Sequence, residues 1–283
     1  MSQWALTPLS KDFGLQLGFT ILDLTSLGGI NMAINQIVAT VTLITQIQSN
    51  SIIGFATGFF YVHNDHLFLV TNRHVVIDKK AGLKPDILRL FLHKDPNNIS
   101  SCEYYDVPLY SKLFKRKWKE HPLKKEVDVV LIKLEKKEIE NNYFIRAWSS
   151  STYLPSHYIL DPGEDVFIMG YPRGFFDDKN NLPIFRNAMI ASTYGVPFQG
   201  TPCFLTDANL HPGTSGSPVI TKPKSTWVDK DGNTNMVTGN PYYILGIHSG
   251  TYSITLGKGK NEPLGLGVTW YIKIVEEIAE LFK

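Results

Sequence analysis

Residues 211–219 read HPGTSGSPV, and the class of this chain depends on how that stretch is interpreted. Gly213 and Gly216 flank Ser215, while Pro212 and Pro218 stand three residues before and after the serine. A serine in this setting belongs either to a surface turn or to a tight loop that presents a nucleophile. Because a serine hydroxyl is a weak nucleophile at neutral pH, the second interpretation requires a histidine base and a carboxylate elsewhere in the chain.

The size and charge of the chain limit the fold classes and the kinds of binding partner to consider. Its 283 residues are 43% hydrophobic and include 22 Gly and 16 Pro, which allows one or two domains and suits a two-barrel β architecture. The 28 basic and 26 acidic residues nearly balance, so we expect no nucleic-acid partner. The basic run KLFKRKWKEHPLKK (112–125) is interpreted as a solvated loop.

Targeting signals are weak in this sequence. Residues 1–31 are interpreted as an N-terminal appendage, because Asp12 and Asp23 interrupt the apolar residues that a secretory signal needs. Met32 opens a strand-like stretch, and we hypothesise that it is the physiological start. No window reaches the roughly 18 uninterrupted apolar residues of a membrane span, so no membrane partner is expected.

The two cysteines, Cys102 and Cys203, have neither CxxC nor metal-ligand spacing. A secreted protein of this size more often carries several disulfides, so we expect a reducing compartment, the cytoplasm, and two buried thiols. A single disulfide between Cys102 and Cys203 is the alternative. No metal or other cofactor is expected, since the chain has no HExxH motif and no clustered ligands.

The dominant pattern is a series of short runs rich in β-branched and aromatic residues, separated by Gly, Pro, Asn and Asp. This density predicts an all-β fold, sandwich or barrel, and a closed barrel has the advantage that it removes exposed edges. The expected strands lie at residues 36–47, 54–62, 65–76, 86–92, 128–134, 164–172, 185–196, 217–222, 242–250 and 265–272.

Helices and loops account for the remaining residues. Residues 272–282 predict an amphipathic closing helix, with apolar side chains on one face and three glutamates on the other. Residues 73–78 predict one short helical turn. The composition of residues 96–125 and 223–241 indicates surface loops.

One histidine and one carboxylate are well placed to serve Ser215. His74 lies at the end of the apolar run FLVTNRHVV, and a strand end is rigid and opens onto the surface. Asp128 precedes the apolar run VVLIKL, where a lone carboxylate is costly unless it is paired. A core histidine and a strand-end cap are the structural alternatives for these two residues. The chain order His, Asp, Ser is the chymotrypsin order and differs from that of subtilisin and of the α/β-hydrolases.

Five segments in this order carry a resemblance to a known family. They are ATGFFYV (56–62), LVTNRHVV (69–76), DVVLIKL (128–134), TDANLHPGTSGSPVI (206–220) and ILGIHSG (244–250). Within about residues 36–280, the chain thus resembles the trypsin/chymotrypsin-like serine peptidases. The resemblance implies two six-stranded antiparallel β-barrels and a C-terminal α-helix in a peptidase domain over 32–283. The N-terminal barrel would cover about 32–140, the C-terminal barrel about 150–270 and the closing helix 272–282.

The resemblance also implies a serine endopeptidase that works through an acyl-enzyme intermediate. Ser215 matches the nucleophile of the family, His74 the general base and acid, and Asp128 the carboxylate that orients the histidine. The backbone N–H groups of Gly213 and Ser215 match the oxyanion hole. Thr214 stands where vertebrate digestive members carry an aspartate, so a zymogen switch of that kind is not expected.

The substrate pocket implied by the resemblance involves Asn209, His211, His248, Ser249 and Gly250. Asn209 is neutral, so a preference for Arg or Lys lacks its usual carboxylate. The S-G-S-P and GIHSG sequences are similar to the bacterial glutamyl-endopeptidase branch, in which the histidine matching His248 contacts an acidic side chain. TDANLHPG is closer to the HtrA-like branch. We hypothesise a preference for Glu or Asp before the scissile bond, and the alternative is a pocket for small or apolar side chains.

Two functions from different classes stay open at this point. The first is an active serine endopeptidase that cleaves a protein or peptide substrate. The second is a catalytically silent module with a protease fold that binds or scaffolds a partner. The complete set of His74, Asp128 and Ser215 with both glycines favours the enzyme. An unidentified regulator stays open, because no motif indicates how activity would be restrained.

Overall fold

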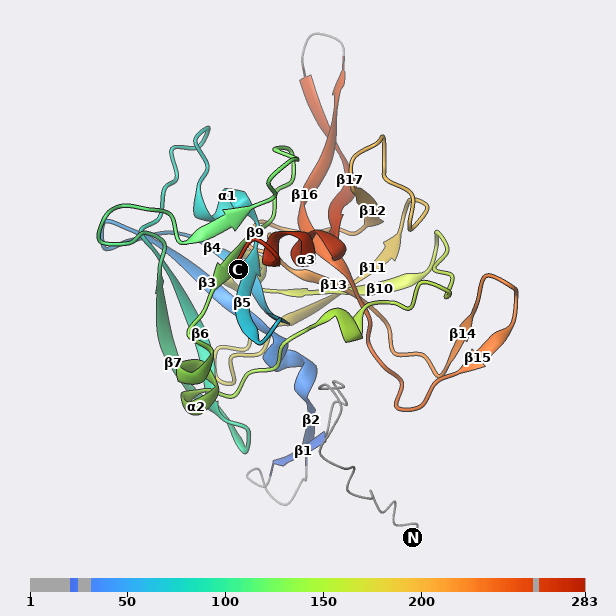
Figure 1. Ribbon diagram of the computed structural model, residues 1–283, viewed down its shortest axis with the longest axis horizontal. Helices are drawn as coiled ribbons and strands as arrows, with labels where there is room; N and C mark the ends of the chain where they lie inside the picture. The colour runs from blue at the N-terminus through green and yellow to red at the C-terminus, as the bar shows by residue number, and fades with distance from the viewer. Residues whose placement is uncertain (1–20, 25–31, 257–259, 283) are drawn as a thin grey trace.

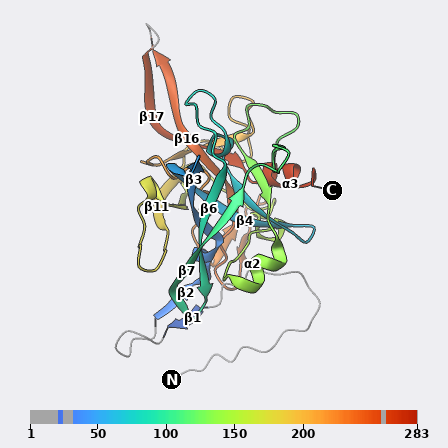
Figure 2. The same cartoon turned by 90° about the vertical axis from the view of Figure 1, so that its left-hand side faces the viewer.

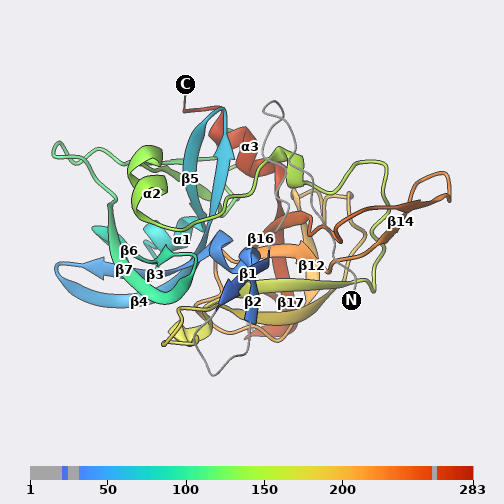
Figure 3. The same cartoon turned by 90° about the horizontal axis from the view of Figure 1, so that it is seen from below.

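The computed structural model describes residues 21–24, 32–256 and 260–282, and it consists mainly of β-strands (Figure 1). The N-terminal half is built on a seven-stranded sheet and the C-terminal half on a closed six-stranded barrel. Seen from below, the sheet and the barrel lie side by side (Figure 3). The appendage expected at residues 1–31 lies outside the described part, except for β1 (Ile21–Leu24), which pairs antiparallel with β2 (Met32–Asn35).

The seven-stranded sheet has the order β7-β6-β3-β4-β5-β9-β8, and each strand runs antiparallel to its neighbours. Its central strands β4 and β5 are joined by a tight turn at Asn64–Asp65, where both residues have positive φ. The strands are β3 (Val41–Gln48), β4 (Ser51–His63), β5 (His66–Thr71), β6 (Ile87–Asp95), β7 (Asn98–Pro108), β8 (Trp118–Glu120) and β9 (Val130–Lys133).

The closed barrel has the order β10-β11-β12-β17-β16-β13, again with antiparallel neighbours. Its two longest strands, β16 and β17, continue past the barrel as a two-stranded ribbon that projects from the molecule in both side views (Figures 1 and 2). The strands are β10 (Asp165–Gly170), β11 (Ile184–Ile190), β12 (Cys203–Asp207), β13 (Pro218–Thr221), β16 (Ile244–Leu256) and β17 (Lys260–Tyr271).

The expectation of two six-stranded barrels is confirmed for the C-terminal half and corrected for the N-terminal half, where the structure has an unclosed sheet of seven strands. In that sheet β7 and β8 are the two edges; the strands themselves are not paired, but just beyond them the Lys117 N–H donates a hydrogen bond of 2.9 Å to the Leu109 carbonyl and an isolated antiparallel bridge joins Tyr110 and Arg116. Val107 of β7 and Trp118 of β8 nevertheless belong to one core cluster. The sheet therefore curls around a common core, and its two edge strands meet only through the short turn between them.

The two segments expected as surface loops contain strands. Residues 96–125 hold β7 and β8, and residues 223–241 hold the hairpin of β14 (Thr226–Val228) and β15 (Thr234–Met236). β7, β14 and β15 are largely exposed and carry many polar residues, whereas β8 is short and buries Trp118. The run expected as a strand at 36–47 begins instead with a 3-10 helix, Gln36–Thr40, because the Asn35 side chain accepts a hydrogen bond from the Ile37 N–H.

The described part also has two further 3-10 helices, Ser150–Thr152 and Pro172–Gly174, and three short α-helices: α1 (Arg73–Val76), α2 (Lys136–Asn142) and α3 (Lys273–Ala279). α3 confirms the closing helix, and its buried Val275 and Ile278 share one core cluster with Phe68 of the sheet and Ile220 of the barrel. This cluster joins the two halves. No helix among the described residues is long and apolar enough to cross a membrane.

Candidate active site

His74 and Asp128 come from neighbouring elements of the N-terminal sheet. His74 lies in α1, directly after β5, and Asp128 lies two residues before β9, which pairs with β5. Asp128 Oδ2 lies 2.6 Å from His74 Nδ1, and Asp128 Oδ1 accepts a hydrogen bond of 3.0 Å from the His74 backbone N–H. The carboxylate therefore holds both the ring and the backbone of the histidine.

Two further groups fix Asp128 in place. The Ser249 hydroxyl donates a hydrogen bond of 2.6 Å to Oδ2, and the Asn72 amide donates one of 2.7 Å to the Asp128 carbonyl. Burial by itself would raise the pKa of Asp128, but the hydrogen bonds from His74 and Ser249 outweigh it and the pKa lies below its ordinary value. The carboxylate is therefore ionised at neutral pH and accepts the Nδ1 proton of His74, which leaves the Nε2 lone pair free.

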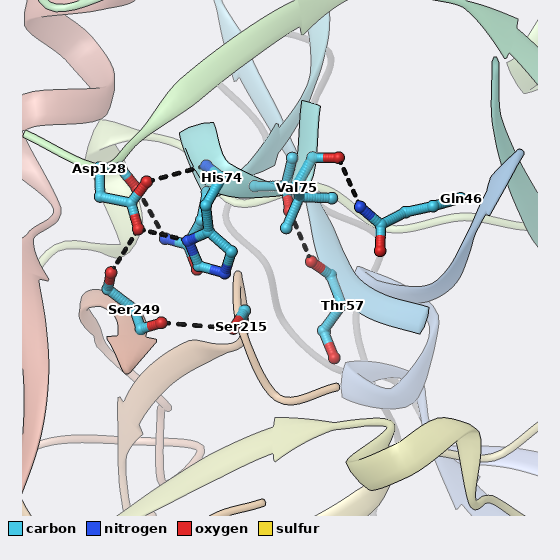
Figure 4. Close-up of polar contacts among 9 residues, drawn as sticks. Gln46, Thr57, His74, Val75, Asp128, Ser215 and Ser249 are labelled. Atoms are coloured by element: carbon cyan, nitrogen blue, oxygen red, sulfur yellow. Dashed lines mark hydrogen bonds and ion pairs between the residues drawn. The ribbon is translucent and has the colours of Figure 1, made fainter. Parts of the chain in front are cut away.

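Ser215 lies across the junction, in the loop that leads into β13 of the barrel. In Figure 4 the imidazole ring of His74 lies between Asp128 and Ser215. The Ser215 hydroxyl donates a hydrogen bond of 3.3 Å to the Ser249 carbonyl, and no hydrogen bond joins it to His74 within the described residues. Asp128, His74 and Ser215 are thus brought together around Ser249, which contacts both the carboxylate and the Ser215 hydroxyl.

The loop of residues 211–217, which we call the serine loop, orients two backbone N–H groups outward. In a trans peptide the C=O and N–H point in opposite directions, and no cis peptide is present in the described chain. The Pro212 carbonyl accepts the Arg173 N–H at 2.6 Å, so the Gly213 N–H points the opposite way. The Thr214 carbonyl likewise accepts the Ser217 N–H at 3.0 Å, which turns the Ser215 N–H away from it.

Neither the Gly213 N–H nor the Ser215 N–H has an acceptor in the described part of the protein. Two such donors in the same loop as a serine hydroxyl are able to bind a negatively charged oxygen where both point to one position. Gly213 has φ of +96°, and a Cβ there would lie 2.5 Å from the Tyr171 carbonyl oxygen. Only glycine fits this position without displacing the neighbouring backbone.

Thr57, on β4 of the sheet, holds the serine loop from the other half of the molecule. Its hydroxyl donates a hydrogen bond of 2.8 Å to the Gly213 carbonyl and accepts one of 3.1 Å from the Tyr171 N–H. Its backbone N–H donates to the Ser215 carbonyl at 2.9 Å. The sequence analysis did not identify Thr57, although the segment ATGFFYV that contains it was among those that carried the resemblance.

The residues expected to form the substrate pocket differ in their surroundings. Asn209 and His211 are exposed, whereas Ser249 and Gly250 are partly buried beside Ser215 on β16. The Asn209 carbonyl accepts a hydrogen bond of 2.6 Å from Arg186, and the His211 carbonyl accepts one of 2.8 Å from the Thr214 hydroxyl. Among these contacts Asn209 and His211 take part through their backbone and not through their side chains.

His248 is 2% exposed, and its Nδ1 has no hydrogen-bond partner in the described protein. Burial, and to a smaller degree the electrostatic effect of the neighbouring His74 site, lowers the pKa of His248 to about 4, so the ring is neutral at neutral pH. A Cβ built on Gly267 of β17 would lie 3.2 Å from Nδ1, so the glycine allows β17 to pack closely against this edge of the buried imidazole.

Cys102 and Cys203 are free thiols; Cys203 is buried and Cys102 is partly buried. Burial raises the pKa of both thiols, which makes them weak nucleophiles. Within the described chain, no group of three or more His, Cys, Asp or Glu side chains is arranged to hold a metal ion.

A family model for the trypsin-like peptidase domain matches residues 56–228, which is more than half of the chain and includes His74, Asp128 and Ser215. The chain belongs to this family. A search of curated proteins found no match for this trypsin-like serine peptidase.

Several solved structures are similar to this trypsin-like peptidase. An inactive form of Rv3671c from M. tuberculosis H37Rv is 16% identical, covers 86% of each chain and has a TM-score of 0.43. The HtrA-type protease AlgW with a tripeptide is 14% identical and has a TM-score of 0.44. A serine endoprotease from Yersinia pestis is 15% identical, also with a TM-score of 0.44. The match to these last two covers 86% of this chain but 60% and 62% of theirs.

Proposed function

We propose that this trypsin-like peptidase is a serine endopeptidase that cleaves protein or peptide substrates through an acyl-enzyme intermediate. The observation that carries the proposal is the contact between Asp128, His74, Ser249 and Ser215 beside two backbone N–H groups without acceptors. A largely buried, ionised carboxylate that fixes the histidine tautomer is what a general base of this kind requires.

The chemistry assigns one role to each group. A rotation of the Ser215 side chain brings its hydroxyl to the free Nε2 of His74, which removes the proton as Oγ bonds to the substrate carbonyl carbon. The carbonyl oxygen becomes negatively charged and is bound by the Gly213 and Ser215 N–H groups; one such donor is worth about 2.7–4 kcal/mol elsewhere. His74 then returns the proton to the leaving amine as the C–N bond breaks, and water repeats the sequence to release the acid.

Labelling by a fluorophosphonate probe tests this proposal. We expect the wild-type protein to form a covalent adduct on Ser215 and the Ser215→Ala variant to form none. Ser217→Ala is the matched control, because Ser217 lies in the same loop and its buried hydroxyl has no hydrogen-bond partner in the described residues. A wild-type protein that is folded but neither reacts with the probe nor cleaves any peptide of a diverse library supports the silent binding module instead.

We further propose that the substrate carries an acidic side chain before the scissile bond. His248 supports this preference, because its ring is buried beside Ser249 and its Nδ1 has no hydrogen-bond partner among the described residues. A carboxylate that reached the ring would accept a hydrogen bond from the N–H of the neutral imidazole, whereas an apolar side chain would leave a buried polar atom unsatisfied.

Peptide-library profiling tests the acidic preference independently of the labelling. We expect kcat/KM to be highest for peptides with Glu or Asp before the cleaved bond and lower for the neutral Gln and Asn analogues. Strong cleavage after Leu or Ala, with none after Glu, would contradict the proposal for His248 while leaving the endopeptidase proposal intact.

A further inference from the structure

Two adjoining cavities beside the candidate active site form one groove on the N-terminal half. The first, about 480 Å³, is lined by His74 and Asp128 themselves and by four cationic side chains. The second, about 490 Å³, adds Lys84, Tyr110 and Phe114. Because both cavities are lined by Ile77, Asp78, Lys79 and Arg116, we describe them together as the basic groove.

Positive charge in the basic groove is not balanced by its own acids. Arg73, Lys79 and Lys80 take part in no ion pair within the described residues. Arg73 is also only partly exposed, and it precedes His74 in the chain. Of the acids that line the first cavity besides Asp128, Glu120 pairs with Arg116 at 3.3 Å. The other, Asp78, uses one carboxylate oxygen to accept the backbone N–H groups of Lys80 and Ala81.

The far end of the basic groove presents aromatic surface. Phe114 is 87% exposed and has φ of +56°. Residues other than glycine adopt this backbone conformation only at a cost in conformational free energy. The turn is held by backbone hydrogen bonds between Ser111 and Phe114 at 2.8 Å and between Ser111 and Lys115 at 2.9 Å. Tyr110 lies beneath Lys84, whose Nζ is 5.1 Å from the ring centroid. The groove thus continues from cations beside His74 to aromatic side chains.

We propose that the basic groove binds an acidic stretch of the protein substrate next to the scissile bond. The inference rests on the proposed endopeptidase function, and it differs from the preference assigned to His248 because it concerns residues flanking the bond. Carboxylates complement the unpaired cations, and an extended segment can contact two cavities that share part of their lining. The net charge of the whole chain, +2, does not reveal this local excess of positive charge. The groove also includes Phe114 and Arg116 from the 112–125 segment, which was expected to be only a solvated loop.

Matched peptides test the groove through turnover. Each pair keeps the cleaved residue constant and carries four Glu or four Gln, on the N-terminal side in one pair and on the C-terminal side in another. For one side we expect the wild-type protein to have a higher kcat/KM for the Glu peptide, with a ratio that shrinks as NaCl rises from 0.05 to 0.5 M. In Lys79→Gln/Lys80→Gln the ratio should fall about threefold to tenfold, as expected for the loss of two exposed ion pairs.

Lys230→Gln is the matched control, because Lys230 is an exposed lysine on the β14–β15 turn, outside the basic groove. It should leave the Glu-to-Gln ratio unchanged. Equal kcat/KM for Glu and Gln peptides on both sides would overturn the groove, and so would a ratio that survives in Lys79→Gln/Lys80→Gln or that falls equally in the control.

Binding separates this inference from the proposed function. Fluorescence anisotropy of the labelled Glu and Gln peptides on the Ser215→Ala protein requires no turnover. Preferential binding of the Glu peptide that is lost in Ser215→Ala/Lys79→Gln/Lys80→Gln supports the groove even if the wild-type protein cleaves nothing. Cleavage without any preference for the Glu peptide in either assay overturns the groove and leaves the peptidase standing.

Discussion

At the scale of a single residue, the hydroxyl of Thr57 in the sheet forms hydrogen bonds to two backbone groups of the other half of the molecule. The Tyr171 N–H and the Gly213 carbonyl both depend on this hydroxyl, and the second of them belongs to the peptide that follows the proposed oxyanion donor. The Arg173 N–H, which donates to the Pro212 carbonyl, gives the serine loop a second support.

Replacing Thr57 by valine should lower kcat much more than it raises KM. The change keeps the side-chain shape but leaves a buried N–H and a buried C=O unsatisfied, at a cost of about 1–3 kcal/mol that the loop can relieve by moving. We expect kcat to fall about tenfold or more, and Thr57→Ser, which keeps the hydroxyl, to restore most of it. Steady-state kinetics measure both constants. A Thr57→Val enzyme with unchanged kcat, or a serine variant as impaired as valine, would show that the hydroxyl does not position the loop.

At the scale of one element, the glycines of the serine loop cannot be replaced by alanine without strain, because they have positive φ and lie against neighbouring backbone. Gly216 has φ of +87°, and a Cβ there would lie 2.1 Å from the Thr57 carbonyl oxygen and 2.5 Å from the Thr71 hydroxyl. The loop is therefore packed directly against β4 and β5 of the sheet. Gly82, in the turn after α1, also has positive φ, at +70°, but nothing lies within 4 Å of its added Cβ.

These two glycines make a matched pair of substitutions. Gly82→Ala should cost only the strain of a left-handed residue, about 1 kcal/mol. Gly216→Ala adds a backbone clash, and we expect a loss of about 3 kcal/mol or more together with loss of probe labelling. Chemical denaturation gives the free energies of unfolding. Equal losses for the two variants would mean that the contact between the serine loop and β4 is looser than the structure indicates.

The whole molecule is held together by one core that spans the sheet, the barrel and α3. Phe68 and Leu131 of the sheet, Trp270 of the barrel and Ile278 of α3 belong to the same buried cluster. Because His74 and Asp128 come from one half and Ser215 from the other, the candidate site exists only while this core is intact. His248 also reflects the assembly, since it is buried in the barrel and its pKa is lowered first by burial and then by His74 of the sheet.

His248 should make the protein less stable as the pH falls from about 6.5 to about 4. Its pKa in the folded protein is about 4, below the ordinary value of about 6.5. In this range the unfolded chain therefore binds a proton that the folded protein does not, and protonation favours unfolding. The loss approaches about 3 kcal/mol at the acidic end. Urea denaturation at pH 7, 5.5 and 4.5 should show a smaller decline for His248→Gln, and parallel declines would contradict the buried neutral imidazole.

Much of the barrel could be predicted from the local pattern, because runs such as 164–172 and 265–272 bury alternate or continuous apolar residues. Edge strands could not be predicted in the same way. β7 leaves most of its residues exposed, and β14–β15 buries only Trp227, so neither carries an apolar pattern that the sequence reveals. The closure of a sheet depends on whether distant edges meet, which local patterns do not record.

By itself, the sequence determined the class of this protein and the identity of its candidate reactive groups, because a serine between glycines, a histidine at a strand end and a carboxylate before a buried strand are local features. Only the tertiary structure decided how they are supported. The hydroxyl of Thr57, the orientation of the Gly213 and Ser215 N–H groups and the basic groove all arise from contacts between distant segments. Such contacts depend on packing in three dimensions, and no spacing along the chain specifies them.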